Sequence, residues 1–112
     1  MPRADFVTLA NQKTYLSKAF DDRVGVALVV STMQALKEQS LPNDLYGVAS
    51  VQEEVGLRGA TTSVRAVNPD VALVLESDIA GDVPGIKPEE SSVKLGAGPS
   101  VSIYDTRMIP NL

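Results

Sequence analysis

The stretch between residues 45 and 75 follows a strand–helix–strand pattern, and this order restricts the folds that the chain can adopt. Leu45–Val51 is a mostly apolar run that is typical of a buried strand. Apolar residues then recur at helical spacing between 57 and 67, and an Asn-Pro-Asp sequence at 68–70 ends that helix. Val71–Leu75 is uniformly apolar, which indicates a strand covered on both faces. Because such units in one sheet are nearly always parallel, we predict an α/β fold in which helices flank a mostly parallel sheet.

Shorter elements are predicted on both sides of this unit. Asp5–Ser17 has the pattern of two short strands around a polar turn at Asn11-Gln12. Apolar side chains at i, i+3, i+4 and i+7 spacing from Val26 onward predict a helix over about 22–39. A turn-rich segment follows the second strand, and a final strand is expected at Ser100–Tyr104.

Composition excludes several functional classes. The chain has 112 residues, which suits one domain, and its 44% hydrophobic content argues against intrinsic disorder. No apolar run approaches the length of a membrane span, and no secretory signal follows Met1, so we expect a cytoplasmic protein without a membrane partner. A net charge of −4 and 4% aromatic residues disfavour nucleic acid as a partner.

The residue types that are missing restrict the chemistry further. The chain has no Cys and no His, so it cannot build a thiolate site, a Ser-His-Asp triad or a histidine-ligated metal by itself. Acid–base chemistry within this chain must therefore use carboxylates.

Carboxylates follow both predicted parallel strands. Glu53 and Glu54 come directly after the first strand, and Glu76 and Asp78 follow the second. The helix predicted over 22–39 is expected to begin at the same edge of the sheet, which adds Asp21 and Asp22. Taken singly, each group has an ordinary explanation, as a helix cap or as part of a solvated loop. Together they would raise one another's pKa unless they were exposed, protonated or bound to a cation, and oxygen ligands alone favour Mg²⁺, Ca²⁺ or Mn²⁺.

Three motifs resemble one known family. They are Lys18–Gly25 (KAFDDRVG), Val51–Ala60 (VQEEVGLRGA) and Asp78–Gly85 (DIAGDVPG). In order and spacing they resemble metallopeptidase family forty-two, the glutamyl, deblocking and tetrahedral aminopeptidases, some of which carry endoglucanase labels. The resemblance covers essentially the whole chain.

The resemblance implies an aminopeptidase that removes N-terminal residues from peptides with two divalent metal ions, usually zinc or cobalt, with manganese as an alternative. On the family pattern Asp21 would bridge the ions, and Glu54 and Glu76 would each be a terminal ligand. Glu53 would be the general base that activates water. Many relatives have Asp at the position of Glu76, so this residue departs from the pattern. Members of the family commonly form homo-oligomers, which is the expectation for the full-length enzyme.

A larger departure is the absence of the family's two metal-binding histidines. The chain resembles the middle of a family member, so we expect a fragment that is inactive alone. Residues 1–17 would end an inserted β-barrel domain, and residues 18–112 would be the central part of a catalytic α/β domain like that of zinc peptidases. Two alternatives stay open, a glycoside hydrolase that uses paired carboxylates and a non-catalytic structural domain.

Overall fold

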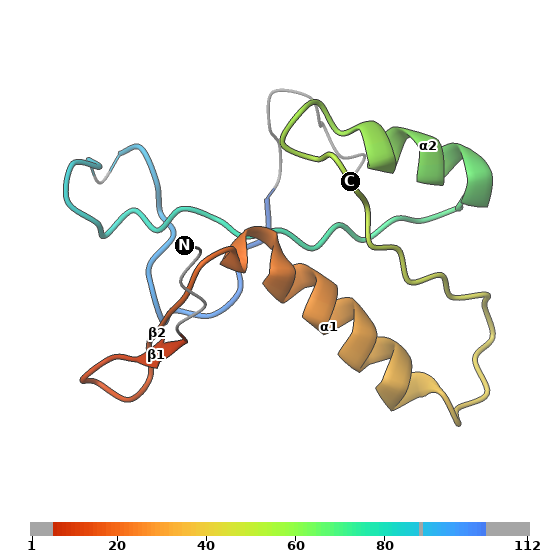
Figure 1. Ribbon diagram of the computed structural model, residues 1–112, viewed down its shortest axis with the longest axis horizontal. Helices are drawn as coiled ribbons and strands as arrows, with labels where there is room; N and C mark the ends of the chain where they lie inside the picture. The colour runs from red at the N-terminus through yellow and green to blue at the C-terminus, as the bar shows by residue number, and fades with distance from the viewer. Residues whose placement is uncertain (1–5, 88, 103–112) are drawn as a thin grey trace. The chain divides into compact units, whose positions relative to one another are not determined.

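The computed structural model describes residues 6–87 and 89–102, in which two short strands are followed by two helices (Figure 1). The strands are β1 (Val7–Thr8) and β2 (Tyr15–Leu16), which pair in a two-stranded sheet. The helices are α1 (Phe20–Leu36) and α2 (Arg58–Val67). The chain divides into two compact units, one built mainly from Leu16–Ser77 and the other from Thr8–Tyr15 with the described residues after Ser77.

The β1–β2 hairpin confirms the prediction of two short strands around a polar turn. Asn11 organises the turn, because its Oδ1 accepts the backbone N–H of Lys13 at 3.1 Å and that of Thr14 at 2.9 Å. The Leu9 N–H donates to the Thr14 carbonyl at 2.8 Å and closes the loop. An Asn side chain that bonds its own backbone in this way is the usual mechanism by which Asn favours turns.

Both predicted helices are present. Helix α1 ends at Leu36, three residues earlier than the sequence pattern indicated, and the ring of Phe20 in its first turn meets that of Phe6 edge-on at 6.3 Å. Helix α2 ends at Val67 and is capped by Asn68, whose left-handed backbone lets its N–H donate to the Val64 carbonyl at 2.8 Å. The proline that follows cannot continue a helix, so the break predicted there is confirmed.

The two predicted parallel strands do not form in the described residues. Residues 45–51 and 71–75 belong to no sheet, and the parallel sheet of the predicted fold class is therefore not confirmed. The prediction that Val71–Leu75 is covered on both faces is wrong for this chain, since Leu73 is 90% and Val71 78% exposed. A strand acquires its hydrogen bonds and its cover only from other segments, and no apolar side chain in the described ranges is buried.

The structure tests the remaining predictions only in part or not at all. The strand predicted at Ser100–Tyr104 is absent as far as Ser102, and its last two residues lie outside the described ranges. The assignment of 1–17 to a barrel domain and of 18–112 to a catalytic domain stays a prediction. Neither helix, within the part of the chain that is described, has the length and apolar character to cross a membrane.

Candidate functional site

Two adjacent carboxylates at the start of α1 have different surroundings. Neither Asp21 nor Asp22 has helical backbone angles, and the peptide bond between them is cis. The Oδ1 atom of Asp22 accepts the backbone N–H of Gly25 at 2.8 Å, which satisfies one of the free donors at the start of the regular helix. Gly25 is buried, and a Cβ atom on it would collide with the Asp22 carboxyl group. Asp22 therefore acts as a helix cap, whereas Asp21 is exposed and makes no capping bond.

Asp21 lies beside Glu76, although 55 positions separate them in the sequence. The Ser77 N–H donates to Glu76 Oε1 at 2.9 Å and lowers the pKa of Glu76. Partial burial, the negative charges of Asp22 and Asp21 and a hydrogen bond with the Asp21 side chain oppose this effect, so the pKa of Glu76 is raised above its ordinary value. The structure thus brings two of the three predicted metal ligands together, and their repulsion is what a bound cation would relieve.

Replacement of Asp21 by Asn should lower the pKa of Glu76 toward its ordinary value of 4.5. The raised pKa means that the folded chain binds this proton more tightly than the unfolded chain, so the resulting stability is present below the ordinary pKa and is lost as pH rises through the raised pKa. The substitution should therefore weaken the decline in stability with rising pH in that window. NMR titration of the Glu76 carboxyl carbon measures the shift. Asp44→Asn is the control, because Asp44 contributes nothing to the Glu76 shift; an unchanged pKa in Asp21→Asn would contradict the contact.

Glu53 and Glu54 lie in a tightly closed loop that leads into α2. The Glu53 carbonyl accepts the N–H groups of Gly56 at 3.0 Å and of Leu57 at 2.9 Å. The Gly59 N–H donates to the Val51 carbonyl at 2.9 Å and closes the base of the loop. A Cβ atom on Gly59 would collide with the Val51 backbone, so this close approach requires glycine. The loop fixes the backbone of both glutamates and leaves their side chains exposed.

The predicted site is only partly assembled. Asp21 and Glu76 are together, but no three Asp, Glu, His or Cys side chains in the described ranges are arranged to hold a metal ion. Glu53 and Glu54 therefore do not join Asp21 and Glu76 in such a group. The Asp21 and Glu76 carboxylates could supply two of the oxygen ligands of a hard cation. They do not complete a site for two ions.

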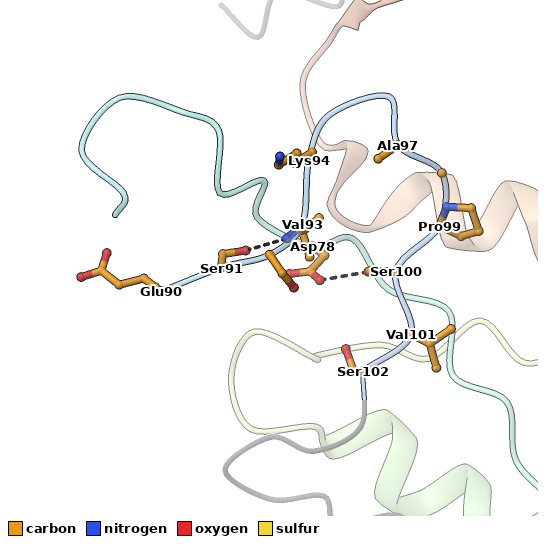
Figure 2. Close-up of a pocket in the computed structure, with 12 residues that line it drawn as sticks. Asp78, Glu90, Ser91, Val93, Lys94, Ala97, Pro99, Ser100, Val101 and Ser102 are labelled. Atoms are coloured by element: carbon orange, nitrogen blue, oxygen red, sulfur yellow. Dashed lines mark hydrogen bonds between the residues drawn. The ribbon is translucent and has the colours of Figure 1, made fainter. Parts of the chain in front are cut away.

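Asp78, which sequence reasoning grouped with the other carboxylates, has a separate role. Its Oδ1 accepts the Ile79 N–H at 2.8 Å and its Oδ2 accepts the Ser100 hydroxyl at 2.9 Å. Figure 2 shows the Asp78 and Ser100 side chains facing each other. Together with Lys94 and Ser102 they line a pocket of about 510 Å³. The 22-residue separation between Asp78 and Ser100 left no local signal of this contact in the sequence.

Comparison with known proteins identifies the family. A family profile described as M42 glutamyl aminopeptidase matches residues 1–112. The chain is 44% identical over 110 residues to the Escherichia coli (strain K12) protein named "Putative aminopeptidase FrvX", a match that covers 98% of the chain and 30% of that protein. It is 34% identical over 105 residues to the glutamyl aminopeptidase of Lactococcus lactis (94% of the chain, 28% of that protein).

The lysyl aminopeptidase of Pyrococcus furiosus is 32% identical over 99 residues, which are 86% of the chain and 27% of that protein. The chain thus spans less than a third of the length of these relatives. The profile match extends from the first residue to the last and includes the three motifs at Lys18–Gly25, Val51–Ala60 and Asp78–Gly85. The chain belongs to the M42 glutamyl aminopeptidase family.

Proposed function

We propose that this chain is the central part of the catalytic domain of a longer, metal-dependent aminopeptidase that removes N-terminal residues from peptides. The family membership and the names of the relatives support a peptidase. The observation that carries the proposal furthest is the contact between Asp21 and Glu76, because it joins two predicted metal ligands from distant parts of the sequence.

The proposed roles are those of the family pattern. Asp21 would lie between two divalent ions, zinc or cobalt or alternatively manganese, and Glu54 and Glu76 would each hold one of them. When bound, such ions supply an activated water and stabilise developing negative charge. Glu53 would accept the proton of the attacking water and pass it to the departing amine. The closed loop around Glu53 supports this role, because it holds the backbone of the base in place without using its side-chain oxygens.

The rest of the ligand set would come from outside this chain. No imidazole exists within these residues, and zinc and cobalt bind more tightly when nitrogen ligands accompany carboxylates. The additional length of the relatives leaves room for such ligands and for segments that cover the exposed apolar residues of 71–75. A cytoplasmic location and assembly into a homo-oligomer remain predictions for the full-length enzyme.

Removal of metal from the full-length enzyme tests the proposal. Release of amino acids from peptides should be lost after chelation and should return when zinc, cobalt or manganese is added, because the water nucleophile depends on the ions. Free amino acids are measured by chromatography before and after dialysis against chelator. Peptidase turnover that survives complete metal removal would contradict the proposal, and chelator-resistant cleavage of a β-glucan would favour a glycoside hydrolase instead.

A further inference from the structure

The loop that leads into α2 is closed by hydrogen bonds between main-chain atoms. The Gly59 N–H donates to the Val51 carbonyl at 2.9 Å, and the Arg58 N–H donates to the Gln52 carbonyl at 3.3 Å. We call residues 51–59 the carboxylate loop, because they contain both adjacent glutamates of the predicted site. These bonds run from the start of the helix to the start of the loop, so the closure does not occupy a carboxylate.

The carboxylate loop also satisfies donors at the start of α2. The first N–H groups of a helix have no partner within the helix, and side chains such as that of Asp commonly accept them. Helix α2 has no side-chain cap, and the main-chain carbonyls of Val51 and Gln52 accept two of its N–H groups instead. Glu53 and Glu54 are therefore close in sequence to a helix start that does not draw on their side chains.

Two residues with left-handed backbone angles flank the glutamates. Gln52 has φ 57° and Leu57 has φ 58°. Such angles are uncommon for residues other than glycine, and they persist only where the surrounding structure holds them. The carboxylate loop supplies that support, since the Gln52 carbonyl accepts one N–H and the Leu57 N–H donates to the Glu53 carbonyl at 2.9 Å. The backbone is thus fixed on both sides of Glu53 and Glu54.

Gly59 determines how closely α2 approaches the first residue of the carboxylate loop. A Cβ atom on Gly59 would collide with the main-chain N and O atoms of Val51. No rotation of a side chain relieves a collision with backbone atoms, so the loop or the helix would have to move. Val51 precedes Glu53 by two residues, which span at most about 7 Å of chain. A displacement at Val51 is therefore transmitted to Glu53 over a short, hydrogen-bonded stretch.

We propose that Gly59 is a positioning residue, which holds Glu53 and Glu54 in place by letting α2 close the carboxylate loop. This inference rests on the proposed function, in which Glu53 is the base and Glu54 is a metal ligand. The two glutamates share one backbone support, so a change at Gly59 affects the base and the ligand together. Gly59 acts through its N–H group and through the absence of a side chain.

The first test compares amide hydrogen exchange in the full-length enzyme and in its Gly59→Ala variant. The amides of Gly56 and Leu57 donate to the Glu53 carbonyl, and they should exchange about fivefold faster or more in the variant, because a displaced loop loses these bonds. Ala60→Gly is the matched control, since it makes the reverse change at the next residue and should leave both amides protected. Unchanged exchange in Gly59→Ala would overturn the proposal, whether or not the protein is a peptidase.

The second test measures kcat and KM for a peptide at saturating Mn²⁺. A misplacement of about 1 Å can cost about 100-fold in rate, so Gly59→Ala should lower kcat by roughly that factor. KM should change little, because the base acts in the transition state. Ala60 is exposed, and Ala60→Gly weakens the helix without adding an atom, so its kcat should stay within about threefold of the wild type.

Helix propensity alone gives the opposite order of activities. Alanine favours a helix and glycine weakens it, so a role limited to helix stability would leave Gly59→Ala the more active of the two variants. An Ala60→Gly enzyme as impaired as Gly59→Ala would overturn the proposal, as would a Gly59→Ala enzyme with the kcat of the wild type.

Gln52 offers a second pair of variants that adds no atom between Val51 and Gly59. Gln52→Gly adopts left-handed angles without strain and should keep kcat within about threefold of the wild type. Gln52→Val should lower kcat as Gly59→Ala does, because a β-branched residue strongly disfavours these angles. Equal kcat in the two Gln52 variants would overturn the proposal, and this pair decides it even where Gly59→Ala yields no folded enzyme. Wild-type enzyme without metal-dependent turnover would instead contradict the proposed function, while the exchange measurement would still decide the role of Gly59 in the loop.

Discussion

Glu53→Gln in the full-length enzyme is expected to lower kcat by about 10²–10⁴-fold while the metal content stays near that of the wild type. The amide has nearly the size of the carboxylate but cannot accept the proton of the attacking water. The loop should be preserved, because the Glu53 backbone carbonyl, which accepts the N–H groups of Gly56 and Leu57, is unchanged by the substitution. Steady-state kinetics with a peptide substrate, combined with metal analysis of the purified variant, measures both quantities.

Glu54→Gln is the matched control for this experiment. It makes the same chemical change at the neighbouring position of the same exposed loop, but in the proposal Glu54 holds a metal ion. This variant should lose metal, and added metal should restore part of its activity. A fully active Glu53→Gln enzyme would contradict the assignment of the base. If Glu53→Gln lost metal and Glu54→Gln kept it, the two roles would have to be exchanged.

The helices and the hairpin could be predicted because their signals are local. The Asn11 side chain bonds the backbone two and three residues ahead, and the end of α2 depends on Asn68 and the proline after it. The 3.6-residue spacing of apolar positions then indicates where each helix runs. None of these features needs a distant segment, so a fragment of a larger fold can retain them.

The predicted parallel strands need partners that local signals do not supply. The uniformly apolar run of Val71–Leu75 is typical of a buried strand, which is why a strand covered on both faces was predicted. In the described residues nothing covers it, and Leu73 is 90% exposed. The chain spans less than a third of the length of the relatives compared, and in the proposed full-length enzyme the cover for this run would come from segments outside these residues.

The hydrogen-bond partners of the individual carboxylates could be identified only in three dimensions. The sequence predicted six of them at one sheet edge, and each taken singly had an ordinary explanation as a helix cap or as part of a solvated loop. The structure uses Asp22 as the cap and Asp78 as a partner of Ser100, and it leaves Asp21 in contact with Glu76. Each outcome depends on which group lies nearby, and for Asp78 and Glu76 that neighbour, Ser100 or Asp21, is distant in the sequence.

The 112-residue chain alone is expected to show no appreciable aminopeptidase turnover, even with added zinc, cobalt or manganese. Catalysis by two ions requires that both be held roughly 3.5–4 Å apart. Of the three predicted metal ligands, only Asp21 and Glu76 have come together, and no three carboxylates in the described part of this chain are arranged to hold a metal ion. With two carboxylates and no imidazole, an ion would remain largely hydrated and would exchange rapidly with solvent.

The same conclusion follows from the packing of the chain. A catalytic pair must be held within a fraction of an ångström, and this precision normally comes from surrounding packed residues. No apolar side chain in the described ranges is buried. The Glu53–Glu54 loop and the Asp21–Glu76 pair therefore share no packed core that would fix the distances between them. The assay is peptide hydrolysis by the purified chain and by the full-length enzyme at equal concentration, with and without chelator. Chelator-sensitive turnover by the isolated chain would contradict this prediction. It would show that the carboxylates hold the ions without the family's two histidines.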